Sequence, residues 1–231
     1  MATTRTLTHD EARRYYDRFG SLQDRQGFYE DKALDEMRAA ASFGEAKAVM
    51  EIGCGTGRLA EKLLSEDLPA GARYLGFDQS GVMIELARKR LHRFGERARV
   101  EQTDGGMRFA VADATIDRVV ATYVLDLLSE NDISSALSEA HRVLEPGGYL
   151  CITGLAHGRS RIGKAIGGLL QLVHRLRPAL VGGCRPLEIV PLLSVGWEIR
   201  FHRVVEPFGI PSEILIAAKN TSPAGARGVS V

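Results

Sequence analysis

Short apolar runs alternate with amphipathic segments along most of the chain. The apolar runs predict strands over residues 46–51, 73–77, 98–102, 116–124 and 149–153. Between them, apolar residues recur every three or four positions, which predicts helices over residues 58–65, 82–94 and 133–144. Strands that alternate with helices in this way form parallel sheets, so the pattern predicts an α/β protein with a doubly wound, Rossmann-like sheet.

The two ends of the chain depart from this alternation. Residues 8–37 read as helical, and Thr8 with Glu11 forms the pattern of a capping box at their start. Near the other end, residues 197–205 and 214–218 are strand-like runs joined by a segment with two prolines and a glycine. That arrangement predicts a hairpin, so one side of the sheet should contain an antiparallel strand.

A glycine-rich loop, Glu51-Ile52-Gly53-Cys54-Gly55-Thr56-Gly57, joins the first strand to the next helix. Such loops bind nucleotides, although a turn without a ligand has the same composition. In the dinucleotide pattern G-x-G-x-x-G the third glycine comes one place later, where this chain has Arg58. Glu51 at the strand end favours a ligand that carries a cation. S-adenosylmethionine has an ammonium, a sulfonium and no phosphate, so it fits better than a nicotinamide dinucleotide.

Acidic and polar residues also follow the later strands, at the edge where open α/β sheets bind ligands. Asp78 is placed to accept the ribose hydroxyls of a nucleoside, or to begin the helix that Ser80 caps. Asp104, followed by Gly105, is placed to accept the adenine amine, or to close a turn. Further residues lie at or beyond the end of the fourth strand, namely Thr122, Tyr123 and Asp126.

In order and spacing, residues 47–152 resemble the class I S-adenosylmethionine-dependent methyltransferases. The motifs are the glycine loop, Leu75-Gly-Phe-Asp78-Gln-Ser80, Asp104-Gly105, the strand from Asp117 to Asp126, and Leu144-Glu-Pro-Gly-Gly-Tyr-Leu150. The nearest branch includes quinone, phospholipid and natural-product methyltransferases, although residues 107–113 lack that branch's usual proline. The resemblance implies a seven-stranded sheet with an antiparallel last strand. It also implies a cofactor, S-adenosyl-L-methionine, held by Tyr16, Glu51, Gly53, Cys54, Gly55, Gly57, Asp78, Gln79, Asp104, Gly105, Thr122 and Tyr123.

We expect a single domain over residues 1–231, with its methyltransferase core over residues 46–220. Residues 1–45 are expected to form a helical lid, and residues 221–231 a disordered tail. In the lid, Tyr15 and Tyr16 either close over the cofactor or pack as an ordinary aromatic helix face.

Methyl transfer requires a general base only when the nucleophile must lose a proton. His157, just past the fifth strand, is the best-placed base in the sequence, although a loop histidine is more often simply solvated. Tyr123 and Asp126 are the alternatives, and Tyr123 reads equally well as an aromatic residue at the edge of the sheet. The sequence does not establish which of these groups, if any, takes part.

Composition narrows the class of protein. The net charge of +1 gives no sign of a nucleic-acid partner, and the three cysteines are too scattered for a disulfide framework or a metal site. The first residues are polar, without a hydrophobic signal segment, so we expect a cytoplasmic location. No pattern indicates an oligomeric state.

A basic amphipathic insertion is expected at about residues 158–190, because residues 146–187 contain no Asp or Glu. Such a segment suits a small hydrophobic or lipid-like acceptor, or peripheral contact with an anionic membrane through residues 159–185. Equally, its apolar face can cap the sheet of the same chain. The sequence therefore predicts a small-molecule methyltransferase; a non-catalytic cofactor-binding protein and a phospholipid N-methyltransferase at a membrane surface are the alternatives.

Overall fold

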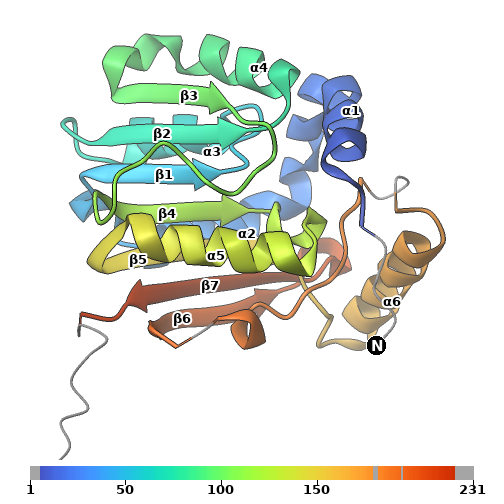
Figure 1. The fold of residues 1–231 in the computed structure, drawn as a ribbon. Coiled ribbons are helices and arrows are strands. Elements are labelled where there is room, and N and C mark those ends of the chain that lie inside the picture. The colour runs from blue at the N-terminus through green and yellow to red at the C-terminus, as the bar shows by residue number, and fades with distance from the viewer. Residues whose placement is uncertain (1–5, 179–181, 194, 222–231) are drawn as a thin grey trace, which may run out of the picture.

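Seven strands form one sheet, and the helices lie on both of its faces (Figure 1). The structure, a computed structural model, describes residues 6–178, 182–193 and 195–221, and the strand order is β3-β2-β1-β4-β5-β7-β6. The five neighbouring strands β3, β2, β1, β4 and β5 are parallel to one another. Strand β7 is antiparallel to both of its neighbours, as predicted. The strands are β1 (Ala48–Ile52), β2 (Arg73–Asp78), β3 (Ala98–Gln102), β4 (Ile116–Thr122), β5 (Leu144–Leu155), β6 (Trp197–Val205) and β7 (Ser212–Lys219).

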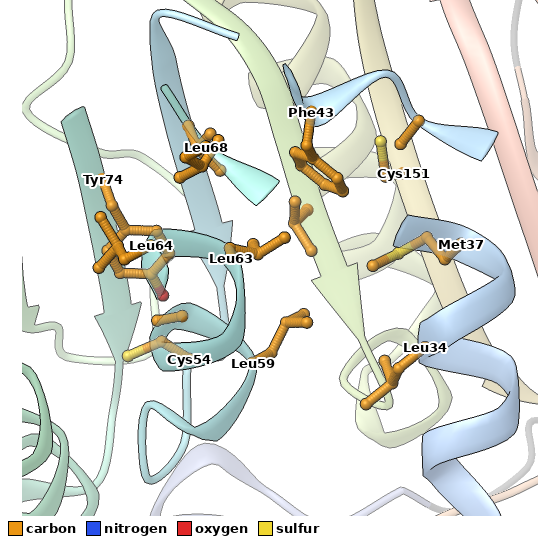
Figure 2. Packing of buried hydrophobic residues seen from close by; sticks show 14 of the residues in the cluster. Leu34, Met37, Phe43, Cys54, Leu59, Leu63, Leu64, Leu68, Tyr74 and Cys151 are labelled. Carbon is orange, nitrogen blue, oxygen red and sulfur yellow. The ribbon is translucent and has the colours of Figure 1, made fainter. Parts of the chain in front are cut away.

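The helices divide between the two faces because the side chains of each strand alternate between them. On one face α2, α3 and α4 pack over Val49, Val120 and Cys151; on the other, α5 packs over their neighbours Met50 and Val119. Figure 2 shows the first of these layers, with Leu34 and Met37 of α2 facing the sheet. The helices are α1 (His9–Phe19), α2 (Gly27–Ala40), α3 (Arg58–Lys62), α4 (Gly81–Leu91), α5 (Glu130–Val143) and α6 (Arg161–Leu176).

Shorter helical turns connect these elements. Most are 3₁₀ turns, and the chain forms one π-helical turn directly after α3. They are η1 (Gly20–Gln26), η2 (Phe43–Glu45), η3 (Leu63–Asp67, the π turn), η4 (His92–Arg97), η5 (Leu125–Leu127), η7 (Val190–Leu192) and η8 (Pro207–Gly209).

Both predicted helix caps are present. The Thr8 side chain accepts a hydrogen bond from the Glu11 amide. The Glu11 carboxylate in turn accepts one from the Thr8 amide, which completes the capping box of α1. The Ser80 hydroxyl accepts from the Met83 amide at 3.1 Å and caps α4.

The prediction of helix across residues 8–37 is wrong in its middle. The chain leaves α1 at Gly20, whose φ of 52° favours glycine, and continues as η1 before α2 begins. This break lets η1 reach the glycine loop, where Asp24 accepts a hydrogen bond from the Thr56 hydroxyl at 2.6 Å. A single straight helix would not make this tertiary contact.

The turn at Pro146-Gly147-Gly148 also differs from its prediction. Helix α5 ends at Val143 and β5 begins at once with Leu144, which pairs with Ile116. The next pair is Arg118 with Tyr149, so the intervening residues bulge out of the pairing register. The Pro-Gly-Gly segment therefore interrupts a strand instead of preceding it.

In the predicted insertion the structure contains α6, and Leu187 forms a parallel bridge with Ala156, the residue directly after β5. In Figure 1, α6 and α1 both lie at the edge of the sheet where the parallel strands end. Within the described part of the chain, no helix has both the length and the apolarity needed to cross a bilayer. Residues 222–231 of the predicted tail lie outside the described residues.

Candidate cofactor site

The loop after β1 follows a path that glycine permits. Gly53, Gly55 and Gly57 have φ angles of 73°, 51° and 76°, in the left-handed region that favours glycine. A Cβ atom on Gly53 would lie 2.7 Å from Cγ2 of Val124, so the loop passes close against the end of β4. The strand ends and the loop thus enclose one side of a cleft.

Four backbone amides of the glycine loop donate hydrogen bonds to other groups of the protein. The amides of Gly53 and Cys54 both donate to the carbonyl of Phe77, at 2.8 and 3.0 Å. The Gly55 amide donates to Oδ2 of Asp78 at 2.9 Å, and that of Gly57 to the carbonyl of Cys54. A pyrophosphate site needs free amides at the loop and the helix start. The amides of Gly53, Cys54, Gly55 and Gly57 are therefore not available to a pyrophosphate.

A carboxylate of the protein lies close to the start of α3. Besides the Thr56 hydroxyl, Asp24 accepts a hydrogen bond from Arg90 at 2.6 Å, and Arg90 also donates to the Thr56 carbonyl. Arg58, at the position of the missing glycine, pairs with Glu30 and Asp31 of α2 at 3.1 and 2.5 Å. These acids disfavour a second anion beside the loop, which argues against a dinucleotide.

Two hollows at this edge of the sheet share the walls Gln23, Gly53, Thr122 and Tyr123. The first contains Asp78, and the second contains Glu51. Of the twelve residues predicted to bind the cofactor, ten line one or both hollows, namely Tyr16, Glu51, Gly53, Cys54, Gly55, Asp78, Gln79, Gly105, Thr122 and Tyr123. Gly57 instead packs against Ala87 of α4, where a Cβ atom would come within 3.2 Å of the backbone.

Glu51 is a buried carboxyl at the end of β1. The Tyr74 hydroxyl donates to it at 2.5 Å, and Thr122 also contacts it. Burial raises the pKa of Glu51 to about 7, although the Tyr74 hydrogen bond opposes the shift and nearby Asp78 adds to it. A ligand cation in the second hollow would stabilise the ionised form.

Asp78 holds the loop and the next helix together, because Oδ2 accepts from the Gly55 amide and Oδ1 from the Ser80 amide at 2.8 Å. Burial raises the pKa of its carboxyl despite these hydrogen bonds. The amides of Gly55, Ser80 and Gln79 use three of the four lone pairs of the carboxylate, so one remains for a hydroxyl donor. Both readings of this residue, helix entry and ribose contact, are therefore compatible with the geometry.

Aromatic residues form the far wall of the first hollow. The rings of Phe77 and Phe109 lie 4.5 Å apart, next to Met107 and Gly105. Asp104 is exposed and its carboxylate accepts from the Gly106 amide at 2.8 Å, so the side chain closes a turn. It is absent from the described residues that line the hollow. Its contact with adenine stays a prediction.

Helix α1 and η1 cover the cleft and contribute residues that carried no sequence signal, His9 and Gln23. Two side-chain contacts fix α1 across it: Ser80 donates to Asp17 at 2.6 Å, and His9 lies 3.2 Å from Asp132. Oε1 of Gln23 is buried without a hydrogen-bond partner among the described residues. An unpaired polar atom on the wall of a cleft is available to a ligand.

The candidate bases differ in position. Tyr123 has a φ of 50°, rare for a residue with a side chain, and its hydroxyl donates to Ser212 at 2.9 Å. Burial raises the pKa of Tyr123, so its phenol stays neutral. Asp126 is almost fully buried, and among the described residues its carboxylate has no side-chain hydrogen-bond partner. Burial raises the pKa of Asp126 to about 7.

His157, the base favoured by sequence, lies elsewhere. It is exposed and lines a separate cleft with His174, Arg175 and Arg185. Strand β5 continues to Leu155 beyond its predicted end, and the bridge between Ala156 and Leu187 turns the following residues towards α6.

Comparisons with known proteins agree with this geometry. Residues 49–148 match a family model described as a methyltransferase domain. An uncharacterized methyltransferase of Oceanobacillus iheyensis is 33% identical over 103 residues, 44% of each chain. A demethylmenaquinone methyltransferase of Tropheryma whipplei is 32% identical over 111 residues, 48% of this chain and 43% of the relative. The chain thus matches less than half the length of these relatives. A tRNA N(3)-methylcytidine methyltransferase of Schizosaccharomyces pombe is 24% identical over 155 residues, 62% of this chain and 49% of the relative.

Among solved structures, the N-methyltransferase NodS of Bradyrhizobium japonicum, in complex with S-adenosyl-L-homocysteine, has a TM-score of 0.61. It is 18% identical, with 82% of this chain and 86% of that chain covered, so the likeness concerns the fold. The strand order described above agrees with that likeness. Residues 49–148 thus form a methyltransferase domain, and the motifs and strand order of the chain support a class I S-adenosylmethionine-dependent methyltransferase.

The cleft fits S-adenosylmethionine. In this cleft Glu51 would hold the ammonium of the methionyl part, and Asp78 would accept the ribose hydroxyls. Phe77, Met107 and Phe109 offer an apolar surface to the adenine ring. The orphaned Gln23 oxygen lies on the wall common to both hollows.

We expect the cofactor affinity of the wild-type protein to increase with pH through about 7, because an ammonium favours the ionised form of Glu51. Below that pH, binding must first release the proton of Glu51. Glu51→Gln keeps an acceptor for Tyr74 but no charge, so its affinity at pH 8 should fall by about ten- to a hundred-fold. Calorimetric titration across pH measures both effects. The ionisation of the ligand itself affects both proteins equally, so a difference between their pH profiles reports on Glu51. Identical pH profiles would contradict the contact between Glu51 and the ammonium.

Loss of the contacts that fix α1 should speed the release of cofactor. In the double variant His9→Ala, Asp17→Ala, two hydrogen bonds of about 1 kcal/mol each disappear. We therefore expect the dissociation rate in stopped-flow experiments to increase by about ten-fold. Asp10→Ala is the matched control, since Asp10 is an exposed acid of α1 that pairs with Arg13. Equal rates in all three proteins would show that α1 does not retain the cofactor.

Proposed function

We propose that this protein is an enzyme that transfers a methyl group from S-adenosylmethionine to a small, hydrophobic or lipid-like acceptor. The observation that carries the proposal is the pair of adjoining hollows, one with Glu51 and one with Asp78, which share Gly53 of the glycine loop. When bound, the cofactor supplies a methyl group already activated by a sulfonium. The protein contributes orientation and exclusion of water, which in favourable cases lower a barrier by roughly 7–11 kcal/mol.

The aromatic residues that line or adjoin the two hollows favour a hydrophobic acceptor. Tyr16 and Tyr123 line the hollows, and the ring of Tyr29 meets that of Tyr123 edge-on at 5.9 Å. Burial raises the pKa values of all three phenols, so they present neutral aromatic surface. Such a lining suits an apolar acceptor better than the bases and phosphates of a nucleic acid, although tRNA methyltransferases are among the relatives.

A titration of the protein with S-adenosylmethionine and, separately, with NAD tests the cofactor. Isotopically labelled S-adenosylmethionine, incubated with quinone, lipid and phenolic acceptors and with tRNA, then tests the reaction. We expect the protein to bind S-adenosylmethionine and not NAD, and the label to appear in an apolar product. Label in tRNA would replace the proposed acceptor class, and binding without any labelled product would favour a non-catalytic cofactor-binding protein.

For an acceptor that must lose a proton, we propose Asp126 as the proton acceptor. Its buried carboxyl lines neither hollow itself, but it lies next to Leu127 and interacts with Tyr16, both of which line the first hollow. With a pKa raised by burial to about 7, the carboxyl is poised near neutral pH, where a general base works best. Tyr123 lacks this property and His157 lies in the other cleft.

Asp126→Asn should reduce kcat by about 10²- to 10⁴-fold and leave the affinity for S-adenosylmethionine unchanged.

The same change, Asp126→Asn, should also stabilise the fold at high pH. Since burial raises the pKa of Asp126 in the folded state, wild-type stability falls as pH increases from about 4 to about 7. The melting temperature of the variant should therefore increase relative to that of the wild type as the pH rises across this range. Glu130→Gln, an exposed neighbour, is the control. Unchanged kcat with altered stability would assign Asp126 a structural role only.

A further inference from the structure

Helix α6 carries large apolar side chains that nothing in the described structure covers. Ile162, Leu169, Leu172 and Leu176 are 67%, 60%, 53% and 74% exposed. At 100° per residue they occupy an arc of about 80° on one side of the helix. Single exposed leucines are common, but four on one face form a surface that marks an interaction site.

The helix packs on the protein through a different face. Its buried positions are Gly163, Gly167 and His174, which lie on the side away from this arc. The glycines allow a close approach to the neighbouring segments; for example, a Cβ atom on Gly163 would lie 2.6 Å from Glu206. The large apolar residues are thus not needed to hold α6 in place, and the insertion does not cap its own sheet with them.

Two aromatic residues extend the apolar arc. Phe208 in η8 is 76% exposed and Phe28 in α2 is 60% exposed, with ring centroids 5.7 Å apart. The next residue, Gly209, lies against Ile162 and Ile166 of α6, since a Cβ atom there would be within 2.8 Å of both. We call the six exposed residues the apolar ridge: Phe28, Ile162, Leu169, Leu172, Leu176 and Phe208.

Phe208 keeps its exposed position in a strained backbone. Its φ of 53° lies in the left-handed region, which costs energy for a residue with a side chain. Pro207 and Gly209 on either side shape the turn. A strained, exposed aromatic residue is typical of a functional contact.

Cations flank the ridge. Arg161, Lys164 and Arg175 are exposed on the adjoining side of α6, and none forms an ion pair with a described residue. The nearest acid at the helix start, Glu206, accepts hydrogen bonds from the amides of Arg159 and Ser160. An apolar stripe beside unpaired basic residues is the pattern of a helix that lies in the plane of an anionic bilayer.

We propose that α6, together with Phe28 and Phe208, docks this protein on an anionic lipid bilayer. The ridge enters the boundary between headgroups and acyl chains, and the three cations meet anionic headgroups. Docking does not depend on methyl transfer.

The ridge also leads to the cofactor cleft, an argument that rests on the proposed function. Phe208 contacts Phe28, Phe28 contacts Tyr29 at 5.1 Å, and Tyr29 contacts Tyr123 at 5.9 Å. Tyr123 lines both hollows. This series of rings gives a lipid-like acceptor an apolar surface between the bilayer and the cleft.

Sedimentation with vesicles tests the docking surface. We expect the protein to bind vesicles that contain phosphatidylglycerol, not vesicles of phosphatidylcholine alone, and to be released by salt. Arg161→Gln, Lys164→Gln, Arg175→Gln should weaken binding by about two orders of magnitude, since each cation near an anionic surface contributes about 1 kcal/mol, a factor of about five. The control Arg73→Gln, Lys89→Gln, Arg99→Gln removes the same charge from exposed sites outside α6 and should retain most of the binding.

Leu169→Gln, Leu176→Gln tests the apolar part, with Ile199→Gln on β6 as a control that is 45% exposed. The ridge variant should lose vesicle binding by at least about ten-fold, while cofactor binding and the melting temperature stay unchanged. Equal vesicle binding by the wild type and both ridge and charge variants would overturn the proposal. So would sedimentation velocity that shows a dimer which the ridge variant dissociates, because the ridge would then contact a second copy. Loss of cofactor binding in the wild type would instead overturn the proposed function alone.

Discussion

Buried carboxyl groups around the ends of the parallel strands, including Glu30 of α2, are the constraint on which the cleft depends. Burial raises the pKa values of Glu30, Glu51 and Asp126 to about 7, and that of Asp78 above its ordinary value. Each ionised group makes its neighbours harder to ionise, as Asp78 does for Glu51. A ligand that brings positive charge relieves this cost, whereas a pyrophosphate would add to it. The crowding of acids and the internal use of the loop amides therefore select the same kind of ligand.

The same groups connect the cleft to its cover. Asp78 holds the glycine loop and the start of α4, and Ser80 at that helix start donates to Asp17 of α1. On the other side of the loop, Asp24 of η1 joins Thr56 to Arg90. The strand ends are thus connected to α1 and η1 through a few short polar contacts. The cover is part of the site, because its own carboxylates complete the surroundings of the loop.

The sequence predicts those features that depend on nearby residues. The caps at Thr8 and Ser80 involve residues three positions away, and each predicted strand follows from its own apolar run. The contacts of α1 depend on pairs far apart in the chain: His9 and Asp132 are 123 positions apart, and Asp17 and Ser80 are 63 apart. No local pattern marks such pairs. The position of His157 depends on a distant pair in the same way, since a bridge between Ala156 and Leu187 lies directly before it.

Helix α6 shows a different limit of sequence patterns. Its apolar periodicity predicts a helix with one apolar face, and the periodicity alone suggests that this face is the packed one. The glycines reverse that outcome, because Gly163 and Gly167 let the backbone approach the protein and leave the leucines outside. The molecule thus has an acidic interior cleft and a basic, apolar exterior within a few side chains of each other. Under the two proposals, a cationic cofactor would bind the first region and an acceptor drawn from an anionic surface would contact the second. The tyrosines between them form the place where the two would meet.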